Sequence, residues 1–496
     1  MKYDVLTEPW ITVVTLDGKT EETGIRGFFE KAHLYRGVVF DSPLEVYAVQ
    51  RMLIAFLMDA YSPERARDRK KLLQKGRFDM DVIERYIADC RAEGVTFDLF
   101  DKERPFMQAP YDAELDEGKS KPAANLFYSV PSGNNHVHFE HHLEQEHEYS
   151  PAECLRGILA LQLFAVSMAQ GYPSSVNDTP CYYSLVDGNN LFGRMVLNML
   201  SRNESMPMTW DEQPVAWRDT SKLIPKSEYA DISILCGMTW QPRRITLIPE
   251  TNGCVRTVYL QQGRNFHQNG RWKDPHVSFK IGKKGAYTLK PEAGREPWRD
   301  IGMFALSRDD KDCIPSMIIK NMEQVAASDE LLQLQLFGVR TSNAKIEGWT
   351  SDSMTIPAEI IESCEKGDRL RANMLFVEDV AKEVYKAVKT FATVQNSKIS
   401  NNGWANNAQA EFFDRIHTFI FSEYLPVLGK ADTAIPGWQK EAMDLLTDTA
   451  IAIADEIVSE YYVRFSDTAR CLKAQVKAEQ SYHATMMKLK KGRENQ

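Results

Sequence analysis

The residues best suited to chemistry in this chain are His136, His138 and His141, which share a run of six positions with Glu140. Neutral imidazole nitrogens and a carboxylate are ligands that zinc accepts. A water molecule bound to such a metal is acidified and can attack a substrate. The spacing therefore raises the hypothesis of a metal-dependent hydrolase.

The surroundings of this cluster favour a different interpretation. The run nearly matches the H-x-H-x-D-H signature of metallo-β-lactamase-like hydrolases, but its acid is a glutamate. Such a site needs another histidine downstream, and after His147 the next one is His267, too far along the chain. The preceding Pro131-Ser132-Gly133-Asn134-Asn135 is typical of a turn. We interpret residues 134–142 as a polar contact loop and keep the hydrolase as an alternative.

Other signatures of catalysis are missing from the sequence. It contains no G-x-x-x-x-G-K-[ST] phosphate loop, no G-x-G-x-x-G dinucleotide motif and no G-x-S-x-G nucleophile elbow. Its eight cysteines are scattered and include no C-x-x-C pair, which argues against a zinc ribbon and against a disulfide framework. We predict no enzymatic activity, no metal and no cofactor.

The overall charge restricts how the chain can bind nucleic acid. Its 496 residues carry a net charge of −9, whereas a self-sufficient nucleic-acid binder is usually basic. Contacts with nucleic acid must then come from local patches, with partners supplying most of the positive field. The start of the chain does not resemble a signal peptide, and no apolar run reaches the ~18 residues of a membrane span, so we expect a cytoplasmic protein.

The elements that position these residues fall into two parts. Residues 1–360 mix strands and helices, which predicts a large α+β domain. Trp10-Ile11-Thr12-Val13-Val14 predicts a strand that ends at the Asp17-Gly18 turn. Periodicity and composition predict helices over 45–61 and 156–168, strands over 244–249 and 256–260, and a polar surface loop over 110–122.

Residues 361–496 are expected to form a four-helix bundle. Apolar residues recur at helical spacing in four segments of about 20 residues joined by short links, the pattern of an antiparallel bundle. The four stripes are Val377, Val380, Ala381, Val384, Val388 and Phe391; Phe412, Phe413, Ile416, Phe419 and Ile420; Trp438, Ala442, Leu446, Ile453 and Ile457; and a weaker one that starts near Leu472 and Val476.

A series of short phrases resembles the CasA family, the large subunit of the type I-E CRISPR Cascade complex. In order, they are Leu6-Thr7-Glu8-Pro9-Trp10-Ile11, Asp41-Ser42-Pro43-Leu44-Glu45, Phe97-Asp98-Leu99-Phe100, Arg104-Pro105-Phe106-Met107-Gln108, Pro131-Ser132-Gly133-Asn134-Asn135, Met238-Thr239-Trp240-Gln241-Pro242-Arg243-Arg244, and Phe337-Gly338-Val339-Arg340 with Asn343-Ala344-Lys345. No single phrase is specific, but their order and spacing, followed by the predicted bundle, are. The resemblance covers essentially the whole chain.

The resemblance implies a role in RNA-guided defence. A CasA-like subunit reads the protospacer-adjacent motif in double-stranded DNA, promotes strand opening and R-loop formation, and helps to recruit the helicase-nuclease. Residues 1–360 would recognise the motif and open the duplex. The implied partners are the backbone, small and guide-end-capping Cascade subunits, the CRISPR RNA, the target DNA and the recruited nuclease. Guide pairing supplies most of the sequence specificity, so few base contacts suffice.

The resemblance also implies which residues touch DNA. The family's glycine loop corresponds to Gly171, Tyr172, Ser174 and Ser175. Its lysine finger corresponds to Gln262-Gly263-Arg264, where Arg264 would replace the lysine. Its glutamine wedge corresponds to Ser342, Asn343 and Ala344. Its flexible loop corresponds to Asn134 through His142, with Asn135, His138 and Phe139. Of Arg243 and Arg244, one would reach a phosphate and the other would pair with an acid. A cysteine cluster of some members is reduced here to Cys254, which implies no zinc.

Overall fold

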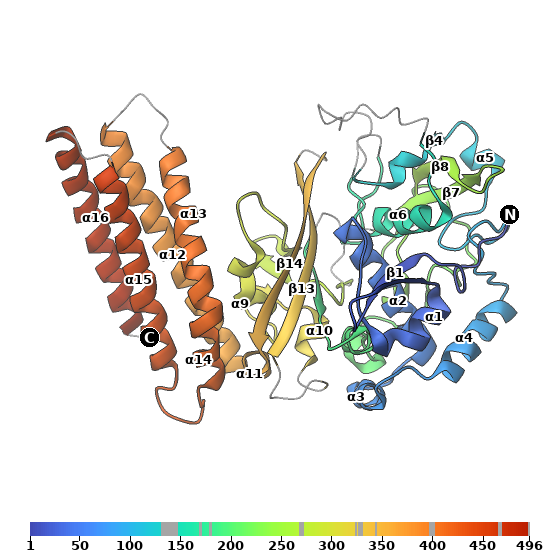
Figure 1. Ribbon diagram of the computed structural model, residues 1–496, viewed down its shortest axis with the longest axis horizontal. Helices are drawn as coiled ribbons and strands as arrows, with labels where there is room; N and C mark the ends of the chain where they lie inside the picture. The colour runs from blue at the N-terminus through green and yellow to red at the C-terminus, as the bar shows by residue number, and fades with distance from the viewer. Residues whose placement is uncertain are drawn as a thin grey trace. The chain divides into compact units, whose positions relative to one another are not determined.

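The structure is a computed structural model that describes residues 1–129, 147–167, 171–177, 181–266, 272–322, 325, 331–342, 345–395, 402–464 and 469–494. The chain divides into two compact units (Figure 1). The first contains Met1–Ala293, Arg308–Ala326 and Gln333–Met354, and the second is built mainly from Gly294–Ser307 and Thr355–Gln496. The expected α+β fold class with a helical C-terminal region is confirmed.

The first unit begins with a small antiparallel sheet in the order β2-β1-β3. Its strands are β1 (Ile11–Thr15), β2 (Thr20–Thr23) and β3 (Tyr35–Val38). Alternate residues of β1 are buried, as expected of a strand that covers a core on one face. Gly18 adopts a φ of 84° between β1 and β2, so the predicted strand and its turn are confirmed.

A central helix, α2 (Pro43–Tyr61), organises the core of this unit. A proline at its start fixes the first turn, and buried residues occur on all its sides. The predicted helix over 45–61 is confirmed. The other helices of this unit are α1 (Ile25–Lys31), α3 (Ala66–Lys75), α4 (Met80–Ala92), α5 (Ala113–Asp116), α6 (Pro151–Leu163), α7 (Leu191–Leu197), α8 (Ile234–Met238) and α10 (Met317–Lys320).

Two predicted segments differ from the structure, one in its boundaries and one in its type of structure. Helix α6 begins earlier than predicted because Ser150 and Glu153 form a reciprocal capping box, and it ends at Leu163 rather than at residue 168. The stretch over 110–122 is no simple surface loop, since it holds α5 and strand β4 (Ser120–Pro122) and its Asp116 is fully buried.

Four further sheets complete the first unit. β7 (Arg243–Pro249) and β8 (Val255–Gln262) confirm the two predicted strands and pair antiparallel, with β4 on the other edge of β8. β5 (Tyr183–Val186) pairs with β13 (Leu331–Ser342), which is followed by the long strand β14 (Lys345–Pro357). One smaller sheet contains β10 (Phe279–Gly282), β11 (Gly285–Thr288) and β12 (Cys313–Ile314). The other pairs β6 (Glu228–Tyr229) with β9 (Asn265–Phe266), and these two strands run parallel.

The second unit carries the expected four long helices, side by side in Figure 1. They are α12 (Cys364–Gln395), α13 (Asn402–Phe419), which continues through a π-helical turn (Ile420–Tyr424) into α14 (Leu425–Lys430), α15 (Gln439–Arg464) and α16 (Ala469–Glu494). Two short helices, α9 (Ile301–Phe304) and α11 (Ala358–Glu362), also belong to this unit. No helix in the described ranges is long and apolar enough to cross a membrane.

The predicted core of the bundle is confirmed for two stripes and wrong for another. Every predicted stripe residue of α12 and of the α13 helix with its π-helical turn is buried. In α16, by contrast, Leu472 and Val476 are 61% and 52% exposed. The described residues of α16 that are buried lie on a neighbouring face and are Ala474, Ala478, Tyr482 and Met486, with Arg493 near the end of the helix. Close helix packing selects this alanine-rich face over the aliphatic one.

Candidate nucleic-acid interface

Three of the segments predicted to contact DNA meet at one end of the β7–β8 hairpin. Arg243, the first residue of β7, is paired with Gln262, the last residue of β8. Tyr172, from the segment after α6, donates its hydroxyl to the carbonyl oxygen of Leu260 at 3.4 Å. The hairpin therefore gathers residues that lie up to ninety positions apart, which no local pattern in the sequence indicates.

Arg243 is buried and holds the 171–175 segment from inside. Its guanidinium donates to the carbonyl oxygen of Pro173 at 2.5 Å and to that of Val166 at 2.8 Å. It also lies 5.1 Å from the ring centre of Tyr172, within the range of a cation–π contact. Its donors are directed at backbone oxygens in the interior, so the described chain does not present Arg243 for a phosphate contact.

Arg244 is also buried, and it forms a two-pronged ion pair with Asp116. Its Nε and Nη2 atoms donate to the two carboxylate oxygens at 2.9 and 2.8 Å. Further hydrogen bonds reach the carbonyl oxygens of Leu223 and Pro110. The prediction that one of the two adjacent arginines binds an acid is confirmed, but neither reaches solvent. Asp116 was missed because its polar surroundings in the sequence are typical of a loop.

Arg264 lies in the interior as well, and only 3% of its surface is exposed. Its Nη2 atom donates to Asp219 at 2.5 Å and to the hydroxyl of Ser221 at 3.0 Å, and its guanidinium lies 5.5 Å from the ring centre of Tyr229. Burial opposes ionisation of Asp219, but the Arg264 charge and nearby hydrogen bonds outweigh it and lower the pKa of Asp219. The DNA contact implied for Arg264 would therefore require this buried ion pair to open.

The predicted glycine loop is exposed at its start and buried at its end. Gly171 adopts a φ of 75°, a left-handed conformation that favours glycine, and it faces open space. Tyr172 and Ser174 are half-buried. Ser175 is buried and its backbone N–H donates to the carbonyl oxygen of Ala165, so the DNA contact predicted for the Ser175 side chain is not accessible.

Asn177 anchors the far end of this loop in a buried polar network. Its side-chain amide donates to Asp274 at 2.8 Å and to the hydroxyl of Tyr183 at 3.1 Å. Asp274 in turn forms a fully buried ion pair with Arg51, through hydrogen bonds of 2.9 and 2.8 Å. The 171–177 segment is therefore linked through Asn177 and Asp274 to Arg51 of α2. None of the predicted DNA-contact residues lies on α2 itself.

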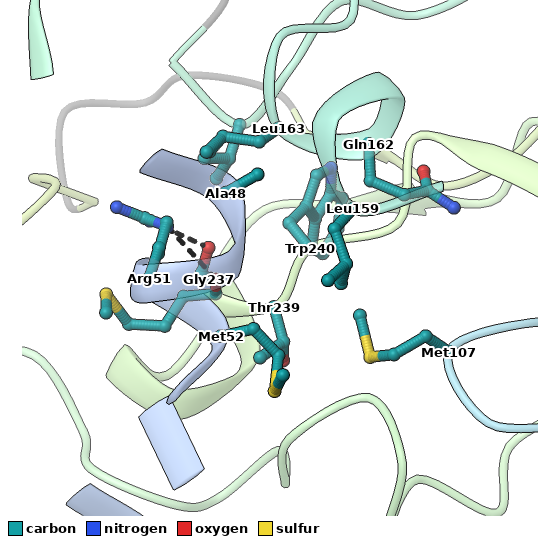
Figure 2. Close-up of a pocket in the computed structure, with 12 residues that line it drawn as sticks. Ala48, Arg51, Met52, Met107, Leu159, Gln162, Leu163, Gly237, Thr239 and Trp240 are labelled. Carbon is teal, nitrogen blue, oxygen red and sulfur yellow. Dashed lines mark hydrogen bonds between the residues drawn. The ribbon is translucent and has the colours of Figure 1, made fainter. Parts of the chain in front are cut away.

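Figure 2 shows the small cavity next to this network, where Arg51 donates to the carbonyl oxygens of Gly237 and Met238. Its volume is about 30 Å³. A buried water needs roughly 10–15 Å³, so the cavity can hold only a water or two and no ligand. The indole Nε1 of Trp240, which lines the cavity, has no hydrogen-bond partner in the described chain. The cavity is therefore too small for a ligand larger than water.

His276 completes the network and stays neutral at physiological pH. Its Nδ1 is 2.8 Å from the hydroxyl of Tyr47, and its Nε2 is 3.0 Å from the carbonyl oxygen of Asn198. Burial, assisted by the positive charge of Arg51, lowers the pKa of His276 to about 4. Such a histidine is a structural hydrogen-bonding group and not a general base.

Several predicted contact residues lie outside the described ranges. These are Asn134, Asn135, His138 and Phe139 of the polar loop, the histidine cluster as a whole, and Asn343 and Ala344 of the expected wedge. Ser342 is the last residue of β13, so the expected wedge follows directly on that strand. Within the described ranges, no group of three or more His, Cys, Asp or Glu side chains could hold a metal ion.

Comparisons with known proteins give a consistent result. The family model for CRISPR-associated protein Cse1 matches residues 4–450. A CRISPR-associated protein CasA/Cse1 from Thermus thermophilus is 26% identical over 406 residues, which is 78% of each chain. The crystal structure of Thermobifida fusca Cse1 shares the fold with a TM-score of 0.78 and 19% identity over 98% of both chains. A chain in the structure of a CRISPR RNA-guided surveillance complex has a TM-score of 0.77 and 20% identity, over 97% of this chain and 99% of that one.

Proposed function

Because the chain belongs to the CRISPR-associated Cse1 family, we propose that it serves as the large subunit of a type I-E RNA-guided surveillance complex. In that assembly it recognises the protospacer-adjacent motif in double-stranded DNA, promotes strand opening and R-loop formation, and helps to recruit the helicase-nuclease. The observation that carries this proposal is the family match over residues 4–450. The fold likeness to a chain of a surveillance complex supports it.

The charge of the chain supports a subunit role over independent DNA binding. With a net charge of −9, the chain repels the phosphate backbone at long range. Around the β7–β8 hairpin, three arginines that would otherwise add positive surface charge are buried and occupied by internal oxygens. Affinity for DNA must then come from the guide RNA and from basic partner subunits, and the chain contributes a few local contacts.

The proposed contacts with DNA come from accessible residues of the 171–174 segment, from the end of β13 and from residues outside the described ranges. Gly171, Tyr172 and Ser174 present a fixed loop whose backbone can approach the duplex closely. Ser342, Asn343 and Ala344 act as the wedge after β13. Asn134, Asn135, His138 and Phe139 belong to the polar loop, where Phe139 would stack on a base or on a partner subunit.

We assign motif recognition and duplex opening to residues 1–360, which the four-helix bundle over 361–496 follows. The partners are the backbone, small and guide-end-capping subunits, the CRISPR RNA, double-stranded target DNA and the recruited helicase-nuclease. We propose no catalytic activity for the chain itself. If the alternative of a hydrolase on His136, His138 and His141 held instead, the purified chain would show metal-dependent turnover that His138→Ala abolishes.

The experiment that tests this function measures target binding by guide-loaded complexes assembled with and without this chain. Two duplexes are needed, identical in the guide-complementary segment and differing only in the adjacent motif. The proposal predicts tight binding only when both the chain and the motif are present. Equal binding of the two duplexes by the complete complex would contradict motif recognition.

A further inference from the structure

Lys226 has an unusual backbone conformation for an exposed basic residue. Its φ is 61°, in the left-handed region that disfavours residues with a Cβ. Three other non-glycine residues of the described chain share this property, and Phe97 and Met107 among them are buried while Ser62 is half-buried. Lys226 is the exposed one. Strained backbone is retained where the surroundings impose it and is often found at functional sites.

The surroundings that impose this conformation are the end of β8 and the start of β9. The backbone N–H of Lys226 donates to the carbonyl oxygen of Gly263 at 2.9 Å, and the N–H of Asn265 donates to the carbonyl oxygen of Ser227 at 2.7 Å. The parallel pairing of β6 with β9 continues this ladder. Lys226 is thus held beside the 262–264 segment, although it lies almost forty positions earlier in the chain.

Neither Gly263 nor Arg264 supplies an exposed positive charge at the end of β8. A Cβ at Gly263 would come within 2.5 Å of the carbonyl oxygen of Gln241 and 2.6 Å of the backbone nitrogen of Arg243, so the position must stay glycine. Arg264 is turned inward and paired with Asp219. Among the described residues, Lys226 is therefore an exposed cation whose backbone is bonded directly to this segment, at Gly263.

Pairing distinguishes Lys226 from its nearest basic neighbour along the chain. Lys222 forms an ion pair with Asp112 at 2.5 Å, although its own side chain is 55% exposed. Lys226 forms no ion pair with an acid of the described chain. A lysine ammonium is a compact point charge on a flexible stem, suited to a phosphate oxygen and not to bidentate reading of a base.

We propose that Lys226 binds a phosphate of the target duplex next to the motif, at the end of the β7–β8 hairpin. This inference rests on the proposed function and adds a residue to it. A single phosphate contact positions the duplex without reading its sequence. It also releases a counterion, so it contributes to the salt dependence of binding.

The test uses the complete guide-loaded complex with three variants of this chain: Lys226→Gly, Lys226→Arg and, as the matched control, Lys222→Ala. Glycine removes the charge and also relieves the left-handed strain, so the Lys226→Gly variant should melt no lower than the unmodified protein. Binding to a motif-bearing duplex is measured over a series of salt concentrations.

Lys226→Gly should weaken binding several-fold at low salt and reduce the slope of log affinity against log salt by about 1. The ratio of affinities for motif-bearing and motif-lacking duplexes should not change. Lys226→Arg and Lys222→Ala should retain the full slope. An unchanged slope in Lys226→Gly, or an equal loss in Lys222→Ala, would overturn the assignment. Failure of the unmodified complex to bind the duplex would instead overturn the proposed function, and this inference with it.

Discussion

The guanidinium of Arg243 lies 5.1 Å from the ring centre of Tyr172 and donates to the carbonyl oxygen of Pro173, the next residue along. One buried cation thus holds both the side chain and the backbone of the loop proposed to approach DNA. Its position at the start of β7 ties the shape of that loop to the β7–β8 hairpin.

We expect Arg243→Lys to reduce recognition of the motif. A lysine keeps the charge, but it cannot reach two carbonyl oxygens while stacking on Tyr172, so about 1–3 kcal/mol of unfolding free energy should be lost. The affinity of the assembled complex for motif-bearing duplexes should fall, whereas affinity for motif-lacking duplexes should not. The control is Arg256→Lys. Arg256 lies on β8 and forms a partly exposed ion pair with Glu148. A lower melting temperature with unchanged motif preference would limit Arg243 to fold stability.

Arg264→Ala should destabilise the fold strongly. Removing one partner of a buried ion pair leaves the other charge uncompensated, which costs about 3–5 kcal/mol. Arg264 and Asp219 are such a pair, with side chains 4% and 13% exposed. Urea denaturation checks this, with Arg256→Ala expected to lose under about 1 kcal/mol because its pair is exposed. Adding Asp219→Asn to Arg264→Ala should recover part of the loss, and a stability change within error for Arg264→Ala would contradict the buried pair.

Protonation of His276 should limit stability in mild acid. The pKa of His276 is lowered to about 4 in the folded chain, whereas in the unfolded chain it is about 6.5. The unfolded state therefore binds more protons below pH 6.5, and the stability present above that pH is lost as the pH falls toward 4. The loss from this residue amounts to roughly 3 kcal/mol at pH 4.

The variant His276→Gln isolates this contribution, since glutamine does not titrate. Denaturant unfolding at several pH values between 7 and 4.5 should show a shallower decline for the variant than for the unmodified protein. Parallel curves would show that His276 does not bind a proton on unfolding.

Local patterns predicted much of the fold, and the reasons for the failures are physical. The helical spacing of apolar residues in α2 and the β-branched runs of β1, β7 and β8 are local patterns. The sequence of each segment therefore indicates its secondary structure directly. In α16 the apolar pair Leu472 and Val476 misled the prediction, because packing against the other helices selects Ala474 and Ala478 instead. Helix contacts across the bundle are not encoded in any one segment.

The sequence indicated that one of the two adjacent arginines pairs with an acid, but it did not show which acids pair with Arg244 and Arg264. Sequence spacing does not show that Asp116 lies beside Arg244 or that Asp219 lies beside Arg264, since each pair is separated by tens of residues. Without those acids, an arginine in a polar stretch is expected at the surface. Lys226 was missed for the same reason, because its proximity to Gly263 is created by the β6–β9 pairing.

Strand opening by Asn343 is the central proposal, and R-loop formation rates measure whether this chain opens DNA as well as docking on it. Complexes carrying the unmodified chain or Asn343→Ala are compared on a fully paired target and on a target already opened as a bubble beside the motif. A wedge lowers the unstacking cost of a few kcal/mol for the first base pair. Asn343→Ala should slow R-loop formation on the paired target, and the bubble should restore the rate. An equal defect on both targets, or none on either, would contradict a role for this chain in strand opening.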